Sequence, residues 1–469
     1  MNRKLVLTLL LSLPLMAHAQ EDKRIKADDF VHKTSSTYEY PTDPEVLTKL
    51  QQWQDQKFGV LFHWGIYAVR GTVESWALCS ETRPFMYNSR KRAHDVPYGE
   101  FKTWYWNQSQ EFNPVNFQPA DWARTMKDAG FRYLLFTTKH HDGFCTFDSK
   151  LTDFTIAKGP FSYSPRKNVA KEVFNAFRDK DFMIGCYFSK PDWHTQWFWN
   201  DAYATKGRHI NYSKERHPDW WKNYQDYTAG QLGELLGGEY GRFDILWLDG
   251  GWITGDDINL DSILVSARGG LHPGLISVDR AIKGRNENYQ TPERGIPATQ
   301  LNYPWESCIP LTGAWGWVHN PHPMSPNKVV GMLAEITAKG GSLLLGVGPT
   351  PLGTIEPVIA NVVTNVGSWL DKNGEAIYST RNAKLYNDGK TWFTANKDGK
   401  TLYAIYAKAD GETLPSTIEW TGNVPEGKMT LLGTGKNVRY TVSPEGKVTV
   451  SLPKGLPDMP VALKFTAKN

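Results

Sequence analysis

An acidic side chain ends a short apolar run near the middle of the chain. The apolar residues 245–248 are followed by Asp249 and then by two glycines. A short apolar run that stops at turn residues is typical of a strand buried on both faces. Ionising a carboxylate at the tip of such a strand is unfavourable unless the protein uses the charge there. Asp249 is therefore the first candidate for catalysis, with a helix cap or a turn residue as the simpler alternative.

Histidine, arginine and tryptophan side chains occur at the ends of other apolar runs. If these runs are parallel strands of an α/β barrel, their C-terminal ends meet at one face and build a shared site. Neutral imidazoles and a guanidinium can donate hydrogen bonds to hydroxyl groups, and indole faces pack on the apolar face of a sugar. A monosaccharide pocket around Asp249 would use His63, His140, His141, Trp247 and Arg280.

The same histidines are also candidate metal ligands. His140 and His141 in a strand would point to opposite sides, so they could bind one ion only if the chain turns there. Together with His63 and Asp142 they could form a zinc site. The sequence contains no HExxH motif or comparable ligand spacing. We therefore favour sugar binding and expect neither a metal nor another cofactor.

A retaining glycosidase needs two carboxyl groups, a nucleophile and an acid/base, roughly 5 Å apart. Asp249 suits the nucleophile, because Arg280 and the histidines would keep it ionised. The acid/base must come from another loop, and the candidates are Glu74, Glu293 and Glu306.

Strand-like apolar runs alternate with amphipathic segments from residue 57 to about 370. This alternation favours a parallel sheet wrapped by helices, and the length suits a (β/α)8-like TIM barrel. An open doubly wound sheet is the alternative, but no GxGxxG follows the first run. The expected strands are 58–63, 132–138, 182–189, 243–249, 275–279, 307–310 and 343–347. The expected helices include 119–129, 169–177, 220–236, 327–339 and 357–370.

The pattern changes after about residue 374 to short alternating runs separated by turn residues. This spacing is typical of a small antiparallel β-sandwich. We therefore predict a barrel domain over residues 20–374 and a sandwich over residues 375–469. The expected strands of the sandwich are 386–396, 401–408, 416–421, 428–432, 438–442, 447–452 and 459–465.

The first 19 residues have the features of a secretory signal peptide. A basic pair precedes an apolar run at 5–16, and small residues precede the predicted cleavage after Ala19. A membrane anchor is the alternative, but the run is too short to span a bilayer easily. We expect an exported protein, periplasmic or extracellular, with no membrane span after cleavage.

Charge and cysteine content narrow the class of protein further. The net charge is +4 over 469 residues, which gives no reason to expect a nucleic-acid partner. The four cysteines are widely spaced with no CxxC pair. Although export permits disulfides, we expect buried free thiols, because two of the cysteines adjoin probable core strands.

Seven motifs in a fixed order carry a family resemblance: FGVLFHWG, TKHHDGF, CYFSKPDW, LWLDGGW, TPE, PWESC and LLLGVGPTPLGTI. Over roughly residues 45–375 the sequence resembles the α-L-fucosidases of glycoside hydrolase family 29. The resemblance implies a (β/α) barrel that removes terminal α-L-fucose from fucosylated glycans, with retention of configuration and without a metal.

The resemblance also implies a role for individual residues. It makes Asp249 the nucleophile and Glu293, in the TPE motif, the acid/base. The implied fucose-binding residues are His63, His140, His141, Tyr187, Trp247 and Arg280, with Trp76 and Trp315 as aromatic walls near the sugar's methyl group.

The sequence departs from the family at one implied site. The usual Glu-Trp pair of the early loop is Glu74-Ser75-Trp76 here, and the acid/base varies in position across the family. Glu306 and Glu74 therefore stay as alternatives to Glu293. A non-catalytic fucose-binding protein and a glycosidase for α-L-galactose are the competing functions. We expect the loops 80–98 and 193–217 to set linkage specificity.

Overall fold

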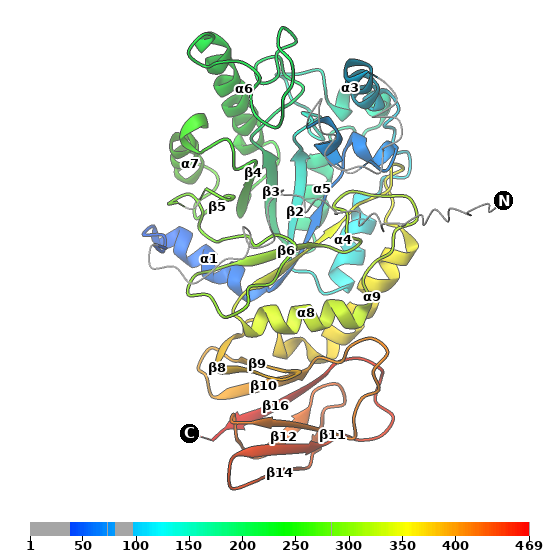
Figure 1. Ribbon diagram of the computed structural model, residues 1–469, viewed down its shortest axis with the longest axis vertical. Helices are drawn as coiled ribbons and strands as arrows, with labels where there is room; N and C mark the ends of the chain where they lie inside the picture. The colour runs from blue at the N-terminus through cyan, green and yellow to red at the C-terminus, as the bar shows by residue number, and fades with distance from the viewer. Residues whose placement is uncertain (1–37, 73, 80–96, 283, 469) are drawn as a thin grey trace, which may run out of the picture.

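Seven parallel strands form a curled sheet at the centre of the computed structural model, which describes residues 38–72, 74–79, 97–282 and 284–468 (Figure 1). The strand order is β5-β4-β3-β2-β1-β7-β6. Each strand predicted for the barrel is present, with ends that differ by at most two residues. The strands are β1 (Phe58–Phe62), β2 (Tyr133–Lys139), β3 (Met183–Ser189), β4 (Ile245–Asp249), β5 (Ile276–Asp279), β6 (Glu306–Pro310) and β7 (Ser342–Val347).

Helices surround the sheet (Figure 1). Several begin with proline in the first turn, where its missing N–H and fixed φ are tolerated. The Ser325 side chain also caps one of them by accepting from the Lys328 N–H at 3.1 Å. The helices are α1 (Pro44–Gln56), α3 (Tyr98–Asn107), α4 (Pro119–Asp128), α5 (Val169–Arg178), α6 (Pro218–Leu236), α7 (Leu260–Gly269), α8 (Pro326–Ala338) and α9 (Pro357–Asn373).

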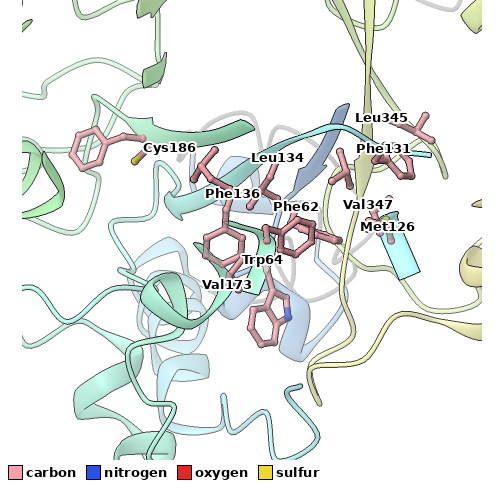
Figure 2. Packing of buried hydrophobic residues seen from close by; sticks show 14 of the residues in the cluster. Phe62, Trp64, Met126, Phe131, Leu134, Phe136, Val173, Cys186, Leu345 and Val347 are labelled. Carbon is pink, nitrogen blue, oxygen red and sulfur yellow. The ribbon is translucent and has the colours of Figure 1, made fainter. Parts of the chain in front are cut away.

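Alternate residues of the strands belong to two separate hydrophobic clusters. In β2, Leu134 and Phe136 belong to the outer cluster, in which Figure 2 shows Phe136 near Val173 of a surrounding helix. Tyr133 and Leu135 belong to the second cluster, inside the curled sheet. Successive side chains of a strand point to opposite faces, so a strand buried on both sides must be apolar throughout. This explains the uninterrupted apolar runs in the sequence.

A segment without regular strand structure spans the gap between the edge strands β5 and β6, which do not pair with each other among the described residues. Near one edge, the Asn288 N–H donates to the carbonyl of Ser277 at 2.8 Å. Near the other, the Arg294 N–H donates to the carbonyl of Cys308 at 2.9 Å. Over the described residues the barrel therefore has seven strands, and segment 284–305 lies where an eighth would close it.

Two antiparallel sheets follow the barrel and share one hydrophobic core. The predicted run 386–396 is wrong as a single strand, because the chain turns at Gly389, whose φ is +58°, and forms a hairpin. The Trp369 Nε1–H of α9 donates to the carbonyl of Pro460 at 2.7 Å and joins the barrel to these sheets. Their strands are β8 (Arg381–Asp388), β9 (Thr391–Ala395), β10 (Thr401–Tyr406), β11 (Thr417–Thr421), β12 (Pro425–Leu431), β13 (Lys436–Val438), β14 (Tyr440–Val442), β15 (Lys447–Ser451) and β16 (Val461–Ala467).

The cysteine prediction is confirmed, since all four thiols are free and buried. Among the described residues, no helix has both the length and the apolar character that crossing a membrane requires. The predicted signal peptide, residues 1–19, lies outside the described residues.

Candidate active site

A pocket of about 610 Å³ lies at the C-terminal ends of the parallel strands. Three of the four candidate catalytic carboxylates line this pocket, namely Asp249, Glu293 and Glu74. The fourth, Glu306, does not. The strand ends supply most of the lining, as the barrel rule predicts. Seven of the eight predicted sugar-binding residues line the pocket: His63, Trp76, His140, Tyr187, Trp247, Arg280 and Trp315.

Asp249 lies at the end of β4 among three polar partners. Its carboxylate accepts from the Tyr187 hydroxyl at 2.6 Å and from the Arg280 guanidinium at 3.0 Å. The eighth predicted residue, His141, places its Nε2 3.7 Å from the same carboxylate. Burial on its own raises the pKa of Asp249, but Arg280, His141 and the Tyr187 hydrogen bond together hold that pKa well below its usual range. Asp249 is therefore an anion, as a nucleophile must be.

One guanidinium joins the two carboxylates that were predicted to react. The Nη1 atom of Arg280 donates to Asp249, and its Nη2 atom donates to Glu293. The backbone N–H of Arg280 donates to the backbone carbonyl of Leu248 at 3.1 Å. This bond holds Arg280 beside the end of β4. Since the donors of a guanidinium lie in one rigid fork, Asp249 and Glu293 are held on neighbouring sides of a single planar group.

Glu293 reaches the pocket because segment 284–305 runs beside β6. The backbone of Cys308 pairs with both neighbours of Glu293. Its carbonyl accepts from the Arg294 N–H at 2.9 Å, and its N–H donates to the carbonyl of Pro292 at 3.0 Å. The Glu293 side chain is 21% exposed, against 14% for Asp249. Glu293 is therefore the more accessible of the two carboxylates.

Glu306 does not line the pocket. It is the first residue of β6, it is fully buried, and its Oε2 accepts from the Tyr133 hydroxyl at 2.7 Å. Burial raises its pKa to about 8, although the hydrogen bond from the Tyr133 hydroxyl acts in the opposite direction. Cys308, two residues further along the strand, lines the pocket instead. Glu306 is therefore placed to hold Tyr133 inside the sheet rather than to reach a substrate.

Glu74 lines the pocket but is committed to the backbone of another loop. Its Oε1 accepts from the N–H groups of Trp315 at 2.9 Å and of Gly316 at 2.8 Å. The residue is 1% exposed, and burial raises its pKa to about 7. Glu74 thus fixes the loop that carries the aromatic wall Trp315.

The three histidines are neutral near pH 7. Burial lowers the pKa of His140 to about 4 and those of His63 and His141 well below the usual range. The Nδ1 of His140 pairs with the Ser75 hydroxyl, and that of His141 with the Ser189 hydroxyl at 2.5 Å. Both rings are therefore oriented by serines, which suits imidazoles that exchange hydrogen bonds with sugar hydroxyls.

The residues that could bind a metal differ from the predicted set, which was His63, His140, His141 and Asp142. Ligand atoms of His140, His141 and Asp249 lie within 4.8 Å of one another. Asp142, expected as a fourth ligand, instead accepts from the Tyr105 hydroxyl at 2.8 Å. The Arg280 guanidinium already neutralises Asp249, which disfavours a dication beside it. The set fits a metal poorly, and the absence of a metal stays a prediction.

Four pocket residues with basic or indole side chains were not predicted from the sequence. Arg294 adjoins Glu293, and Trp252 ends the stretch that contains Asp249, so proximity to a predicted residue was the available signal. Arg208 and His209 come from the loop 193–217, whose part in specificity was expected without naming a residue. The other loop expected to set specificity, 80–98, lies almost entirely outside the described residues.

Comparisons with known proteins identify the family and the fold of this chain. The profile of the family described as alpha-L-fucosidase matches residues 26–375. Plasma alpha-L-fucosidase of Rattus norvegicus is 26% identical, over 96% of this chain and 95% of its own. Among solved structures, alpha-L-fucosidase isoenzyme 1 from Paenibacillus thiaminolyticus is 27% identical, with a TM-score of 0.75 over 91% of this chain and 100% of its own. Thermotoga maritima alpha-fucosidase, solved with a mechanism based inhibitor, is 25% identical, with a TM-score of 0.71 and the same coverage, 91% and 100%.

Proposed function

The chain belongs to the α-L-fucosidase family, and from that premise we propose that it is a retaining exo-glycosidase that removes terminal α-L-fucosyl residues from fucosylated glycans. One observation carries the assignment of roles: Arg280 contacts both Asp249 and Glu293 in the same pocket. The shared contact brings two carboxyl groups together in one pocket, as a two-carboxylate mechanism requires.

The surroundings of the two carboxylates support different roles. Asp249 has Arg280, Tyr187 and His141 around it, and these keep its pKa low. Glu293 lies on segment 284–305, outside the sheet, and is more exposed. A nucleophile needs a fixed anion, and an acid/base needs access to protons. We therefore assign Asp249 as the nucleophile and Glu293 as the acid/base.

The first chemical step forms a covalent intermediate. A carboxylate oxygen of Asp249 attacks the anomeric carbon of the fucosyl group while the bond to the leaving oxygen breaks. Protonated Glu293 gives its proton to that oxygen, so the leaving group departs as an alcohol.

The second step regenerates the enzyme. Ionised Glu293 removes a proton from water, and the water oxygen attacks the anomeric carbon and displaces Asp249 as a free carboxylate. Two displacements at one carbon restore the original configuration. Fucose leaves, and Glu293 is again protonated for the next turnover.

The pocket walls support a preference for a 6-deoxy sugar. The Trp315 ring lies 5.4 Å from the His63 ring, and the two are stacked. An indole face receives a methyl group without desolvating a polar group, whereas the hydroxymethyl of α-L-galactose would lose a hydrogen bond to water. We therefore favour fucosides over the galactosides of the same leaving group.

The test uses Asp249→Ala on an aryl α-L-fucoside. The variant should lose turnover, and azide should partly restore it and yield a fucosyl azide of inverted configuration, because azide takes the place of the missing carboxylate. Wild-type protein that binds fucose but releases none would instead support a non-catalytic binding protein. Faster cleavage of the matched galactoside would assign the other sugar.

Export is part of the same proposal. The N-terminal pattern of residues 1–19 supports cleavage after Ala19 and release to the periplasm or the medium. Mass measurement of the protein recovered from its native compartment should give a chain that begins at Gln20. A chain that retains residues 1–19 would contradict export by this route.

A further inference from the structure

An arginine in the partly exposed part of the pocket lining, here called the mouth, lies beside two tryptophans that are also partly exposed. The Arg208 guanidinium carbon is 5.3 Å from the ring centre of Trp76 and 5.2 Å from that of Trp252. The two indoles are themselves 5.8 Å apart. All three side chains line the pocket. This group, Arg208 with Trp76 and Trp252, is called the rim cluster below.

The backbone beneath the rim cluster is fixed by two other buried tryptophans. The Trp193 Nε1–H donates to the carbonyl of Arg208 at 3.2 Å, and the Trp199 Nε1–H donates to that of His209 at 2.9 Å. Trp193 and Trp199 are buried and stack on each other at 4.8 Å. The loop therefore presents Arg208 from a rigid base, so little conformational entropy is lost when a ligand binds.

Among the described residues, no carboxylate pairs with Arg208. Within the described part of the chain its guanidinium has neither an ion pair nor a hydrogen bond, although its side chain is half-buried. The pocket carboxylates have other partners: Arg280 contacts both Asp249 and Glu293, and Glu74 binds backbone N–H groups. The positive charge at the mouth is therefore available to a ligand.

The position of Arg208 decides which part of a ligand it would meet. An exo-glycosidase holds the cleaved sugar at the closed end, here beside Asp249, so the leaving group must occupy the mouth. A guanidinium between indole faces is weakly hydrated and offers paired N–H donors to a planar or tetrahedral anion. We propose that the rim cluster is a subsite for an anionic group, a carboxylate or a sulfate, on the leaving group. This inference rests on the proposed fucosidase activity.

The test compares aryl α-L-fucosides in isosteric pairs that differ by one charge. The carboxylate arm pairs 4-carboxyphenyl with 4-carbamoylphenyl fucoside. The sulfonate arm pairs 4-sulfophenyl with 4-sulfamoylphenyl fucoside. The 3-substituted isomers of the same compounds place the charged group at a different position relative to the fucosyl group. In each arm the ratio of kcat/KM, charged over neutral, is measured for wild type and for Arg208→Gln. Differences in leaving-group reactivity cancel between the two proteins, and so does any loss of folded protein.

The ratio should fall about tenfold or more in Arg208→Gln, the size expected for charge-assisted hydrogen bonds. Arg208→Lys keeps the charge without the planar donors and should lie between the two. Arg216→Gln removes the same charge from an exposed site of the same loop, outside the pocket, and should keep the wild-type ratio. Added salt should lower the ratio in wild type more than in Arg208→Gln.

The two arms identify the anion. A ratio that falls in Arg208→Gln only in the carboxylate arm indicates a carboxylate, and one that falls only in the sulfonate arm indicates a sulfate. A ratio that changes less than twofold in both arms and both isomers would overturn the proposal and leave Arg208 a packing residue. If wild type released no fucose from any compound, the proposed activity would fail by itself. In that case the dissociation constants of the same pairs, measured by calorimetry for wild type and Arg208→Gln, decide the subsite.

Discussion

Replacing Glu74 by glutamine separates the two roles that its place in the pocket allows. Glutamine keeps a side-chain oxygen that can accept from the Trp315 and Gly316 N–H groups, which lie 2.9 Å and 2.8 Å from Glu74 Oε1. If Glu74 only holds the Trp315 loop, Glu74→Gln should retain most of the turnover of an aryl fucoside. Glu74→Ala leaves two buried N–H groups without a partner, each at about 1–3 kcal/mol, so a loss of about 2–6 kcal/mol of stability is expected.

The pH dependence of stability gives a second measurement on the same variant. Burial raises the pKa of folded Glu74 to about 7 from an ordinary value of 4.5. The protonated side chain therefore contributes to the free energy of unfolding. This contribution is fully present below pH 4.5 and is lost as the pH rises through about 7. A separation of about 2.5 between these pKa values, at 1.36 kcal/mol per pKa unit, makes this loss about 3 kcal/mol. Because glutamine does not titrate, the stability of Glu74→Gln should not show this fall with rising pH.

Thermal unfolding at pH 5 and pH 8 tests this reasoning. The Tm of Glu74→Gln relative to wild type should be higher at pH 8 than at pH 5. An equal difference at both pH values would show that Glu74 is not held protonated by burial. A loss of turnover that grows as the leaving group becomes poorer would refute the structural role and make Glu74 the acid.

Three further results are expected. Glu293→Ala should slow aryl fucosides with poor leaving groups far more than those with good ones, and equal losses across the series would move the acid role elsewhere. Glu306→Gln should keep most of the turnover, and its Tm relative to wild type should rise between pH 5 and pH 9, because burial raises the pKa of Glu306 to about 8; a shifted limb in the pH–rate profile would instead give Glu306 a part in proton transfer. Prolonged treatment with a chelator should leave the rate unchanged, and recovery of a lost rate by an added divalent ion would establish a metal at His140, His141 and Asp249.

The sequence alone determined the barrel strands and most of the pocket. Apolar runs that are buried on both faces are continuous in the sequence, and the residue at the end of each run lies at one face of a parallel sheet. His63, His140, Asp249 and Arg280 could therefore be predicted to meet without knowledge of the fold's details. The order of the motifs then indicated the family and the role of Glu293.

The tertiary structure decided what each acidic and basic residue contacts. Glu74, Glu293 and Glu306 are equivalent in sequence, but one binds a loop backbone, one shares Arg280 with Asp249, and one is buried beneath the pocket. Arg208 enters the pocket only because buried tryptophans fix its loop. Such contacts join residues far apart in the chain, and their distances depend on irregular segments. Local pattern carries no information on those distances, because hydrophobic periodicity describes strands and helices and not the loops between them.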